Sequence, residues 1–374
     1  MSPTEKFMPS YLILAVIFAA SFYLLNKGSF DQINVAHYDF LDNAITETRI
    51  KPDYVRAIYL TAYSASNEDF RQSIIAKIKD SRINTVIIDI KDYSGYILYN
   101  SELQNLHAIN AVKYRMKDVQ KILDDFHQAE IYVIARQTVF QDPVLAEAMP
   151  NLAFQTWQGN IWRDNKGLAW VDPNKKEVWQ YNLAIAKEAT DFGFDEINFD
   201  YMRYPSDGNM ANINYALPEN KVKTDVMKEF YKFLSDNLSD HTTISIDMFG
   251  LVMDHTDDGY DLNIGQKLLD AVDYFDYVYP MMYASHYPLN YLGLENSAEY
   301  PGIVIAHGLK ISQSALENKR AKIRPWLQAF NIGATYDAAK INAQITATEN
   351  ATSTTAGWAL WNARNYYPDY IFTK

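Results

Sequence analysis

The chain contains no cysteine among its 374 residues. It therefore forms no disulfide, has no thiolate nucleophile, and offers no cysteine ligands for zinc or an iron–sulfur cluster. Its seven histidines are scattered, without an HExxH or His-x-His spacing. A zinc or di-iron site would have only scattered carboxylates as ligands, so we expect no metal and no other cofactor.

Three further signatures are missing. The chain has no G-x-S-x-G nucleophile elbow and neither of the glycine-rich phosphate loops, G-x-x-x-x-G-K-[ST] and G-x-G-x-x-G.

Positive charge is also scarce, since the chain has 34 Lys and Arg against 46 Asp and Glu, for a net charge of -12. A nucleic-acid-binding protein would carry a basic stripe, so we expect no nucleic acid partner, and no obligate protein partner is evident.

The N-terminal segment differs in kind from the rest. Residues 8–25 carry no charge and lie between Lys6 and Lys27. This run is at the short end of the roughly 17–25 residues that span a bilayer and longer than the roughly 7–15 of a signal-peptide core. Because no clear cleavage site follows Leu25, we expect an uncleaved anchor of an exported protein. A cleaved signal, which would make the protein secreted, and a buried core helix are the alternatives.

The remaining sequence alternates strand-like and helix-like segments. Residues 1–27 form the anchor or signal, 28–52 a polar linker and 53–374 one domain, whose composition, 48% hydrophobic overall, is ample for a large core. The expected strands are 55–60, 85–91, 131–137, 196–201, 243–248, 277–282, 324–330 and 357–361. The expected helices are 68–80, 113–128, 174–192, 221–238, 265–271, 311–321 and 336–350. Eight such units predict an α/β fold, a (β/α)8 TIM barrel.

The fourth expected strand lies in the segment FDEINFDYMRYPSDG, residues 194–208. Ile197 and Phe199 alternate with Asn198 and Asp200, so one face is apolar and the other polar. The segment then leads into Arg203 and a Pro-Ser-Asp-Gly turn. A half-buried surface strand would carry polar residues of no particular kind, so this pattern is typical of a catalytic strand end in a barrel.

Asp200 and Asp247 fall at matching ends of the fourth and fifth expected strands. Neighbouring strands lie about 4.8 Å apart, which brings two such carboxylates within several Å of each other. Paired carboxylates are what glycoside hydrolysis needs, because one protonates the leaving oxygen while the other attacks the sugar or activates water. Interior ion pairs that fill the barrel are the structural alternative for each residue taken alone.

Other polar and aromatic side chains fall near the ends of the remaining strands. Flat rings with polar neighbours suit the faces of sugars. Core packing is an alternative for Trp326 and Trp361. In the loop after the third strand we favour stacking on sugar for three tryptophans, Trp157, Trp162 and Trp170. We expect the following residues to contact a carbohydrate substrate: Asp89, Lys91, Arg136, Arg203, Tyr279, Tyr283, His286, Gln328 and Trp361.

Eight ordered blocks resemble a known family. They are VRAIYLTAY, NTVIIDIKDYSGYILY, GFDEINFDYMRYPSDG, SIDMFG, IGQ, YVYPMMYASHYP, RPWLQAF and GWALWNA. Together they resemble the bacterial putative glycoside hydrolase domain family, of uncharacterised function, and more distantly other barrel glycosidases with an FDYxRYP strand. The resemblance covers nearly all of 55–367 and implies a barrel enzyme that acts on carbohydrate.

The resemblance also places the two acids. Asp200 matches the acidic position of the FDY block and Asp247 that of the S-x-D-x-F-G block. By analogy with amylase-like barrels, we assign Asp200 as nucleophile or base and Asp247 as general acid. The predicted function is hydrolysis of a polysaccharide or oligosaccharide by an exported enzyme. Alternatives are a non-catalytic, envelope-anchored glycan-binding barrel and a polysaccharide deacetylase, which would need a metal site.

Overall fold

The computed structural model describes residues 40, 51–256 and 258–373. The predicted anchor or signal at residues 8–25 and most of the predicted linker lie outside these residues, so export and membrane anchoring stay predictions. Within the described part of the chain, no helix combines the length and the apolar character that a membrane crossing requires.

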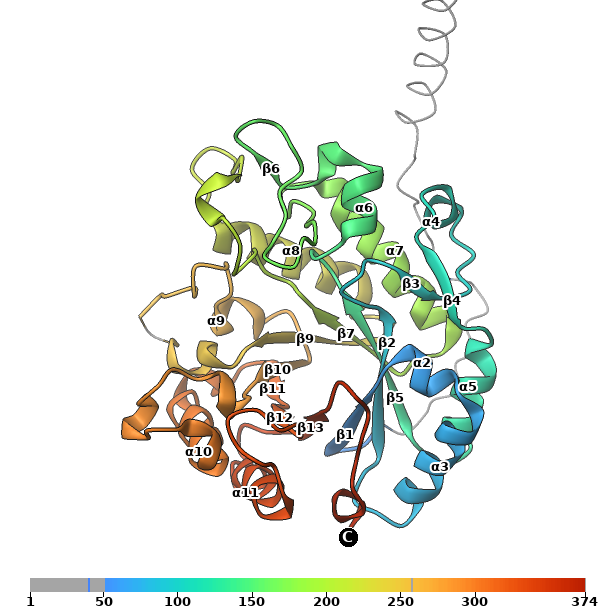
Figure 1. The fold of residues 1–374 in the computed structure, drawn as a ribbon, viewed down its shortest axis with the longest axis vertical. Coiled ribbons are helices and arrows are strands. Elements are labelled where there is room, and N and C mark those ends of the chain that lie inside the picture. The colour runs from blue at the N-terminus through green and yellow to red at the C-terminus, as the bar shows by residue number, and fades with distance from the viewer. Residues whose placement is uncertain (1–39, 41–50, 257, 374) are drawn as a thin grey trace, which may run out of the picture.

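Eight parallel strands form a closed barrel at the centre of the molecule (Figure 1). Each strand pairs with its neighbours in chain order, and β1 pairs with both β2 and β13, which closes the cylinder. The barrel strands are β1 (Val55–Leu60), β2 (Thr85–Lys91), β5 (Tyr132–Thr138), β7 (Glu196–Asp200), β9 (Thr243–Phe249), β10 (Tyr277–Met281), β12 (Trp326–Gln328) and β13 (Gly357–Trp361). The predicted (β/α)8 TIM barrel is confirmed.

Helices surround the barrel, as Figure 1 shows. They are α2 (Ala62–Ser66), α3 (Glu68–Lys79), α4 (Gln104–Ala108), α5 (Val119–His127), α6 (Pro143–Ala148), α7 (Lys176–Phe192), α8 (Lys223–Leu238), α9 (Leu268–Ala271), α10 (Pro301–Ile311) and α11 (Ala338–Glu349). The main hydrophobic core lies between these helices and the outer face of the barrel. A smaller apolar cluster, which includes Ile87, Ile134 and Trp326, fills the barrel interior.

Short strands extend the loops at the C-terminal ends of the barrel strands. After β2 the chain forms β3 (Ile97–Tyr99), antiparallel to β2, and then β4 (Val112–Met116). The loops after β5 and β7 are tied together by β6 (Gln155–Thr156) and β8 (Ile213–Asn214), which pair antiparallel. These loops build one side of the barrel mouth, where sites of such barrels lie.

The helix predicted over 113–128 is partly wrong. Its first part is strand β4, because Val112 pairs with Ile97 and Met116 with Tyr99. Helix α5 begins only after Asp118, whose side chain accepts a hydrogen bond from the Lys121 amide and caps the helix. Strand pairing with a distant partner, which local sequence does not reveal, overrides the helical pattern here.

The helix predicted over 311–321 is also wrong in position. Helix α10 ends at Ile311 and begins at Pro301, which suits the first turn because it needs no backbone donor. Gly302 and Gly308 lie inside α10, and because glycine is a poor helix former the sequence did not predict a helix here. A Cβ at Gly308 would lie 2.6 Å from Cε of Met282, so the end of that methionine side chain would have to move to admit a larger residue. The helix predicted over 265–271 shortens to α9.

The seventh barrel strand is interrupted. Of the predicted strand 324–330, only Trp326–Gln328 is strand, β12, and the short strand β11 (Lys322–Ile323) precedes it, separated from it by Arg324 and Pro325. Proline has no amide hydrogen to donate to the ladder, which explains the break. Both pieces pair with β10, so the strand still completes the barrel.

Candidate active site

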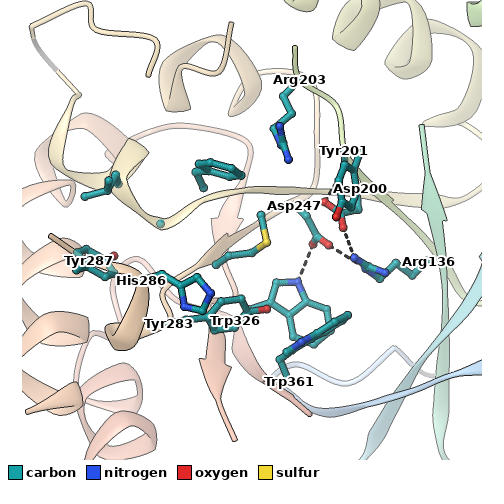
Figure 2. Close-up of a pocket in the computed structure, with 14 residues that line it drawn as sticks. Arg136, Asp200, Tyr201, Arg203, Asp247, Tyr283, His286, Tyr287, Trp326 and Trp361 are labelled. Carbon is teal, nitrogen blue, oxygen red and sulfur yellow. Dashed lines mark hydrogen bonds and ion pairs between the residues drawn. The ribbon is translucent and has the colours of Figure 1, made fainter. Parts of the chain in front are cut away.

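Asp200 and Asp247 converge at the C-terminal ends of neighbouring strands. Asp200 is the last residue of β7, and Asp247 lies near the end of β9, which pairs with β7. Both carboxylates line one cavity of about 450 Å³, seen in Figure 2. They are 3% and 1% exposed, so they lie at the bottom of the cavity rather than on the open surface. The sequence prediction that these two residues share one rim holds.

Arg136 on β5 sits at the centre of three carboxylates. Its Nη1 lies 2.7 Å from Oδ1 of Asp89, its Nε lies 3.2 Å from Oδ2 of Asp247, and its Nη2 donates to Oδ2 of Asp200. Burial opposes the charge of Arg136, but the attraction of Asp200, Asp89 and Asp247 raises its pKa well above the ordinary value. One fixed cation therefore faces up to three negative charges.

Asp247 is the carboxylate best suited to hold a proton. Its Oδ1 accepts hydrogen bonds from Nε1 of Trp326 at 2.8 Å and from Nδ2 of Asn198 at 3.0 Å. Burial, followed by repulsion from Asp200, raises the pKa of Asp247 from 3.8 to about 7, although Arg136, Trp326 and Asn198 act in the opposite direction. A carboxyl group with this pKa can donate a proton near neutral pH.

Asp200 has a different environment. Its Oδ1 accepts a hydrogen bond of 2.6 Å from the amide of Tyr201, and its Oδ2 accepts one from Arg136. Tyr201 has a φ of 54°, a left-handed conformation uncommon outside glycine, Asn and Asp. Both oxygens of Asp200 thus face donors, an arrangement that suits an anionic nucleophile or base.

Asp89 completes the charged cluster from β2. Its second oxygen accepts a hydrogen bond from the hydroxyl of Tyr59, and burial raises its pKa against the opposing effects of Arg136 and Tyr59. Asp89 does not line the cavity of Asp200 and Asp247 but an adjacent one of about 570 Å³. The interior ion pairs that the sequence left open as an alternative are therefore present around Arg136.

Aromatic side chains form the remaining walls of the cavity. Trp326 and Trp361 meet edge to face, with ring centroids 5.4 Å apart, and the ring of Trp361 lies 4.9 Å from the Arg136 guanidinium. Tyr283, His286 and Tyr287 line the cavity from the segment after β10. Burial lowers the pKa of His286, which favours the neutral ring. Flat rings next to charged groups can hold the faces and hydroxyls of a sugar.

Trp361 stands between three cavities. It lines the cavity with the two aspartates, the adjacent cavity that Asp89 and Tyr93 line, and a third of about 680 Å³ that Phe330 and Tyr366 line. The first and third cavities also share Tyr283 and His286. The barrel mouth is therefore hollowed on both sides of Trp361.

Arg203 reaches the cavity from the loop after β7. It is 8% exposed and lines the same cavity as Asp200 and Asp247. Figure 2 shows its guanidinium on the opposite side of the two aspartates from Trp361. Of the residues predicted to contact substrate, this cavity therefore brings together Arg136, Arg203, Tyr283, His286 and Trp361, while Asp89 lines its neighbour.

Lys91 lies outside the cavities described above, contrary to its predicted contact with substrate. The register of β2 against β5 shifts between Asp89 and Lys91, so Lys91 pairs with Gln137, which contacts helix α7. This bulge turns Lys91 away from the barrel interior. Its Nζ lies 2.8 Å from Oδ2 of Asp142, and both side chains are fully buried. The ion pair fixes Asp142, the residue that caps the N-terminus of α6.

Tyr279 and Gln328 also lie outside the cavities described above. The hydroxyl of Tyr279 accepts a hydrogen bond of 3.1 Å from Nη1 of Arg324. Arg324 in turn pairs with Glu196, and this fully buried cluster lies deeper in the barrel than the cavity. Gln328 accepts from the amide of Ser285 at 3.1 Å and donates to the carbonyls of Phe330 and Ile332. Gln328 therefore joins the loops after β10 and β12.

Two of the three loop tryptophans are buried rather than available for stacking. Trp162 and Trp170 are each 2% exposed, and their indole nitrogens donate to Asn209 and Asp164. Trp157 is 65% exposed but does not line the cavity of the two aspartates. The preference for sugar stacking by these loop residues was wrong for Trp162 and Trp170.

Sequence reasoning missed three residues that shape the site. The hydroxyl of Tyr59 donates to Asp89, and its ring stacks on Trp361 with ring centroids 4.0 Å apart. The alternation of β1, which places Tyr59 on the inward face together with Ala57, could have predicted this position. Asn198 was visible in the alternation of β7 but had no assigned partner. Gly250 lines the cavity, where a Cβ would lie 2.6 Å from the carbonyl oxygen of Met281.

Solved structures with similar folds include several glycoside hydrolases. The PgaB (BpsB) glycoside hydrolase domain from Bordetella bronchiseptica shares 14% identity, with a TM-score of 0.59 over 85% of this chain and 95% of that chain. A beta-N-acetylhexosaminidase shares 12% identity, with a TM-score of 0.56 over 86% of this chain and 71% of that chain. At these identities the similarity establishes the shared fold.

A hypothetical protein from Ruminiclostridium thermocellum ATCC 27405 shares 36% identity, over 51% of this chain and 96% of that chain, with a TM-score of 0.48. No curated protein matches the chain significantly. The family described as "Putative glycosyl hydrolase domain" matches residues 57–367, which include most of β1, the other seven barrel strands and both aspartates. By this match, the chain belongs to the putative glycosyl hydrolase domain family.

Proposed function

We propose that this protein hydrolyses glycosidic bonds of a polysaccharide or oligosaccharide, with Asp247 as general acid and Asp200 as nucleophile or base. The observation that carries the proposal is the different setting of two carboxylates in one cavity. The pKa of Asp247 is raised to about 7, while both oxygens of Asp200 face donors. Glycosidases need one carboxyl group protonated and the other ionised at the same pH.

Arg136 supports this division of roles. With three carboxylates around one guanidinium, the cluster is stabilised when one carboxylate carries a proton. Asp247, the least exposed of the three, is the one on which repulsion by Asp200 acts most directly. In the proposed reaction, Asp247 gives its proton to the departing glycosidic oxygen. Asp200 then attacks the anomeric carbon or activates a water for that attack.

The shape of the barrel mouth supports a chain-like substrate. Cavities of about 570 and 680 Å³ adjoin the 450 Å³ cavity of the two aspartates, and Trp361 lines all three. Sugars on both sides of the cleaved bond would then rest against Trp361 and its neighbours. Export to a compartment where polysaccharide is present is part of the proposal and rests on the uncharged run at residues 8–25.

The test is release of reducing ends from a panel of polysaccharides by the wild type and by Asp200→Asn and Asp247→Asn. Each substitution is expected to lower turnover by at least 10³-fold, because each removes one of the two essential carboxylates. Asp207→Asn, which changes an exposed carboxylate in the same loop, serves as the matched control and keeps full activity. Hydrolysis that persists in both variants would overturn the mechanism.

A second candidate function is glycan binding without hydrolysis. It is favoured by the direct contact of both aspartates with Arg136, which a purely structural ion cluster would also show. Under this hypothesis the wild type binds a glycan of the panel and releases no product. Because there is no turnover to lose, the Asp200→Asn and Asp247→Asn variants would then differ from the wild type in glycan binding only.

A further inference from the structure

Arg203 is a buried cation without an ion-pair partner. It is 8% exposed, and Nη1 donates to the carbonyl of Tyr204 at 3.0 Å and to Oγ of Ser206 at 3.2 Å. Among the described residues, no carboxylate oxygen lies within 4.0 Å of its nitrogens. The other buried cations of the barrel each have such a partner: Lys91, Arg136 and Arg324.

The surroundings of Arg203 are aromatic and neutral. Its guanidinium carbon lies 5.0, 5.0 and 4.7 Å from the ring centroids of Trp170, Tyr201 and Phe249. These rings orient the guanidinium plane but supply no negative charge. Burial lowers the pKa of Arg203, and the attraction of Tyr201, Asp200, Asp207 and Asp164 only partly offsets this effect.

The nearest carboxylates beyond ion-pair range have partners of their own. Asp200 is held by Arg136, Asp164 accepts from the indole of Trp170 and from backbone amides, and Asp207 accepts from the Asn165 amide. None of them directly pairs with Arg203. A buried guanidinium is costly unless an anion pairs with it, so an anion from outside the chain would complete this site.

The free donors of Arg203 face the cavity. Nε and Nη2 have no hydrogen-bond acceptor among the described residues, whereas Nη1 is held by the loop. In Figure 2 the guanidinium points from the loop into the space above Asp247. Two adjacent N–H groups on a planar guanidinium match the two oxygens of a carboxylate.

We propose that Arg203 binds a carboxylate carried by the sugar in the cavity, so that the substrate is an acidic glycan. The inference rests on the proposed function, since it names the class of substrate for the same cavity. The carboxylate belongs either to a uronic acid ring or to a carboxyalkyl ether on an amino sugar. Both present the same planar anion to Nε and Nη2.

The test is equilibrium binding by the full wild-type chain of free monosaccharides, which contain no glycosidic bond and so cannot be hydrolysed. The probes are three matched pairs: glucuronate and glucose, galacturonate and galactose, and N-acetylmuramate and N-acetylglucosamine. In at least one pair the acid is expected to bind at least tenfold more tightly than its neutral partner. The uronate pairs and the muramate pair distinguish the two sources of the carboxylate.

Added substitutions at Arg203 make the test specific. Arg203→Gln is expected to abolish the preference for the acid and to change binding of the neutral sugar less than threefold. Arg203→Lys keeps the charge but loses the two-pronged contact, so it is expected to lose about tenfold for the acid. Should the Gln variant not fold, the Lys variant supplies the result. Arg163→Gln, at an exposed arginine that pairs with Glu147, is the matched control and keeps the preference.

Two results would overturn the inference. The first is equal binding of acid and neutral sugar in all three pairs, and the second is a preference for the acid that survives Arg203→Gln. Failure of the proposed function appears differently, as a preference for the acid in binding together with no hydrolysis of any acidic polysaccharide by the wild type. The two failures are therefore distinguishable.

Discussion

Trp326 donates its indole N–H to Asp247 over 2.8 Å, from the seventh barrel strand to the fifth. This hydrogen bond stabilises the carboxylate form of Asp247, whose pKa is about 7. Trp326→Phe removes the donor, so the pKa of Asp247 is expected to rise further. If Asp247 is the general acid, the alkaline limb of the pH–rate profile moves up from about pH 7 by about one unit.

The measurement is kcat against pH for wild type and Trp326→Phe. Trp361→Phe is the matched control, because Trp361 lines the same cavity without a hydrogen bond to Asp247. The control is expected to leave the limb in place even if activity falls. An unmoved limb in Trp326→Phe, or the same movement in both variants, would contradict the role of Asp247.

Asp247 also predicts a pH dependence of stability. Its folded pKa of about 7 lies above the ordinary 3.8, so the proton on Asp247 stabilises the fold. That contribution is complete below about pH 4 and is lost as the pH rises through about 7. Asp247→Asn cannot titrate, and its stability relative to wild type should rise between pH 5 and pH 8, by up to about 3 kcal/mol. Denaturant unfolding at both pH values measures this difference, and a constant difference would refute it.

The barrel was predictable because its signal is repeated. Strands β1, β2 and β13 match the predicted 55–60, 85–91 and 357–361 residue for residue, since buried parallel strands are apolar runs bounded by polar segments. The convergence of Asp200 and Asp247 followed from the same logic, because the carboxyl ends of parallel strands meet at one rim.

What could not be predicted depends on local backbone geometry and distant partners. Lys91 left the inward face because one bulge after Asp89 reverses the alternation, and a strand pattern carries no sign of a bulge. Gln328 gave no sign that it would serve loop carbonyls rather than a ligand. The isolation of Arg203 appears only in three dimensions, because it depends on which carboxylates other groups already hold.

Arg136 is expected to be essential for stability as well as for the site. Arg136→Met leaves Asp89, Asp200 and Asp247 buried together without a cation, which should cost about 3–5 kcal/mol in the free energy of unfolding. The loss should be larger at pH 8 than at pH 5, since protonation relieves the repulsion at the lower pH. Urea unfolding at both pH values is the measurement. Arg56→Met, which breaks a partly exposed pair with Glu349, should cost at most about 1 kcal/mol.

Lys91 is expected to act on stability alone. Lys91→Met leaves the buried carboxylate of Asp142 unpaired and should cost about 3–5 kcal/mol in the free energy of unfolding. Adding Asp142→Asn should recover most of this loss, because the amide carries no charge and keeps the oxygen that caps α6. The kcat/KM of the folded single and double variants should equal that of wild type. A lower kcat/KM without loss of stability would instead return Lys91 to the substrate-binding residues.

Trp361 is expected to control binding of chains rather than of single sugars, because it lines three adjoining cavities. Trp361→Ala removes a ring that sugars on both sides of the cleaved bond would contact. KM for a hexasaccharide should rise about tenfold with a smaller change in kcat, and KM for a disaccharide should change less. Trp157→Ala, at an exposed tryptophan outside the cavity of the two aspartates, is the control and should alter neither. An equal rise of KM for both chain lengths would mean that the flanking cavities do not bind the substrate.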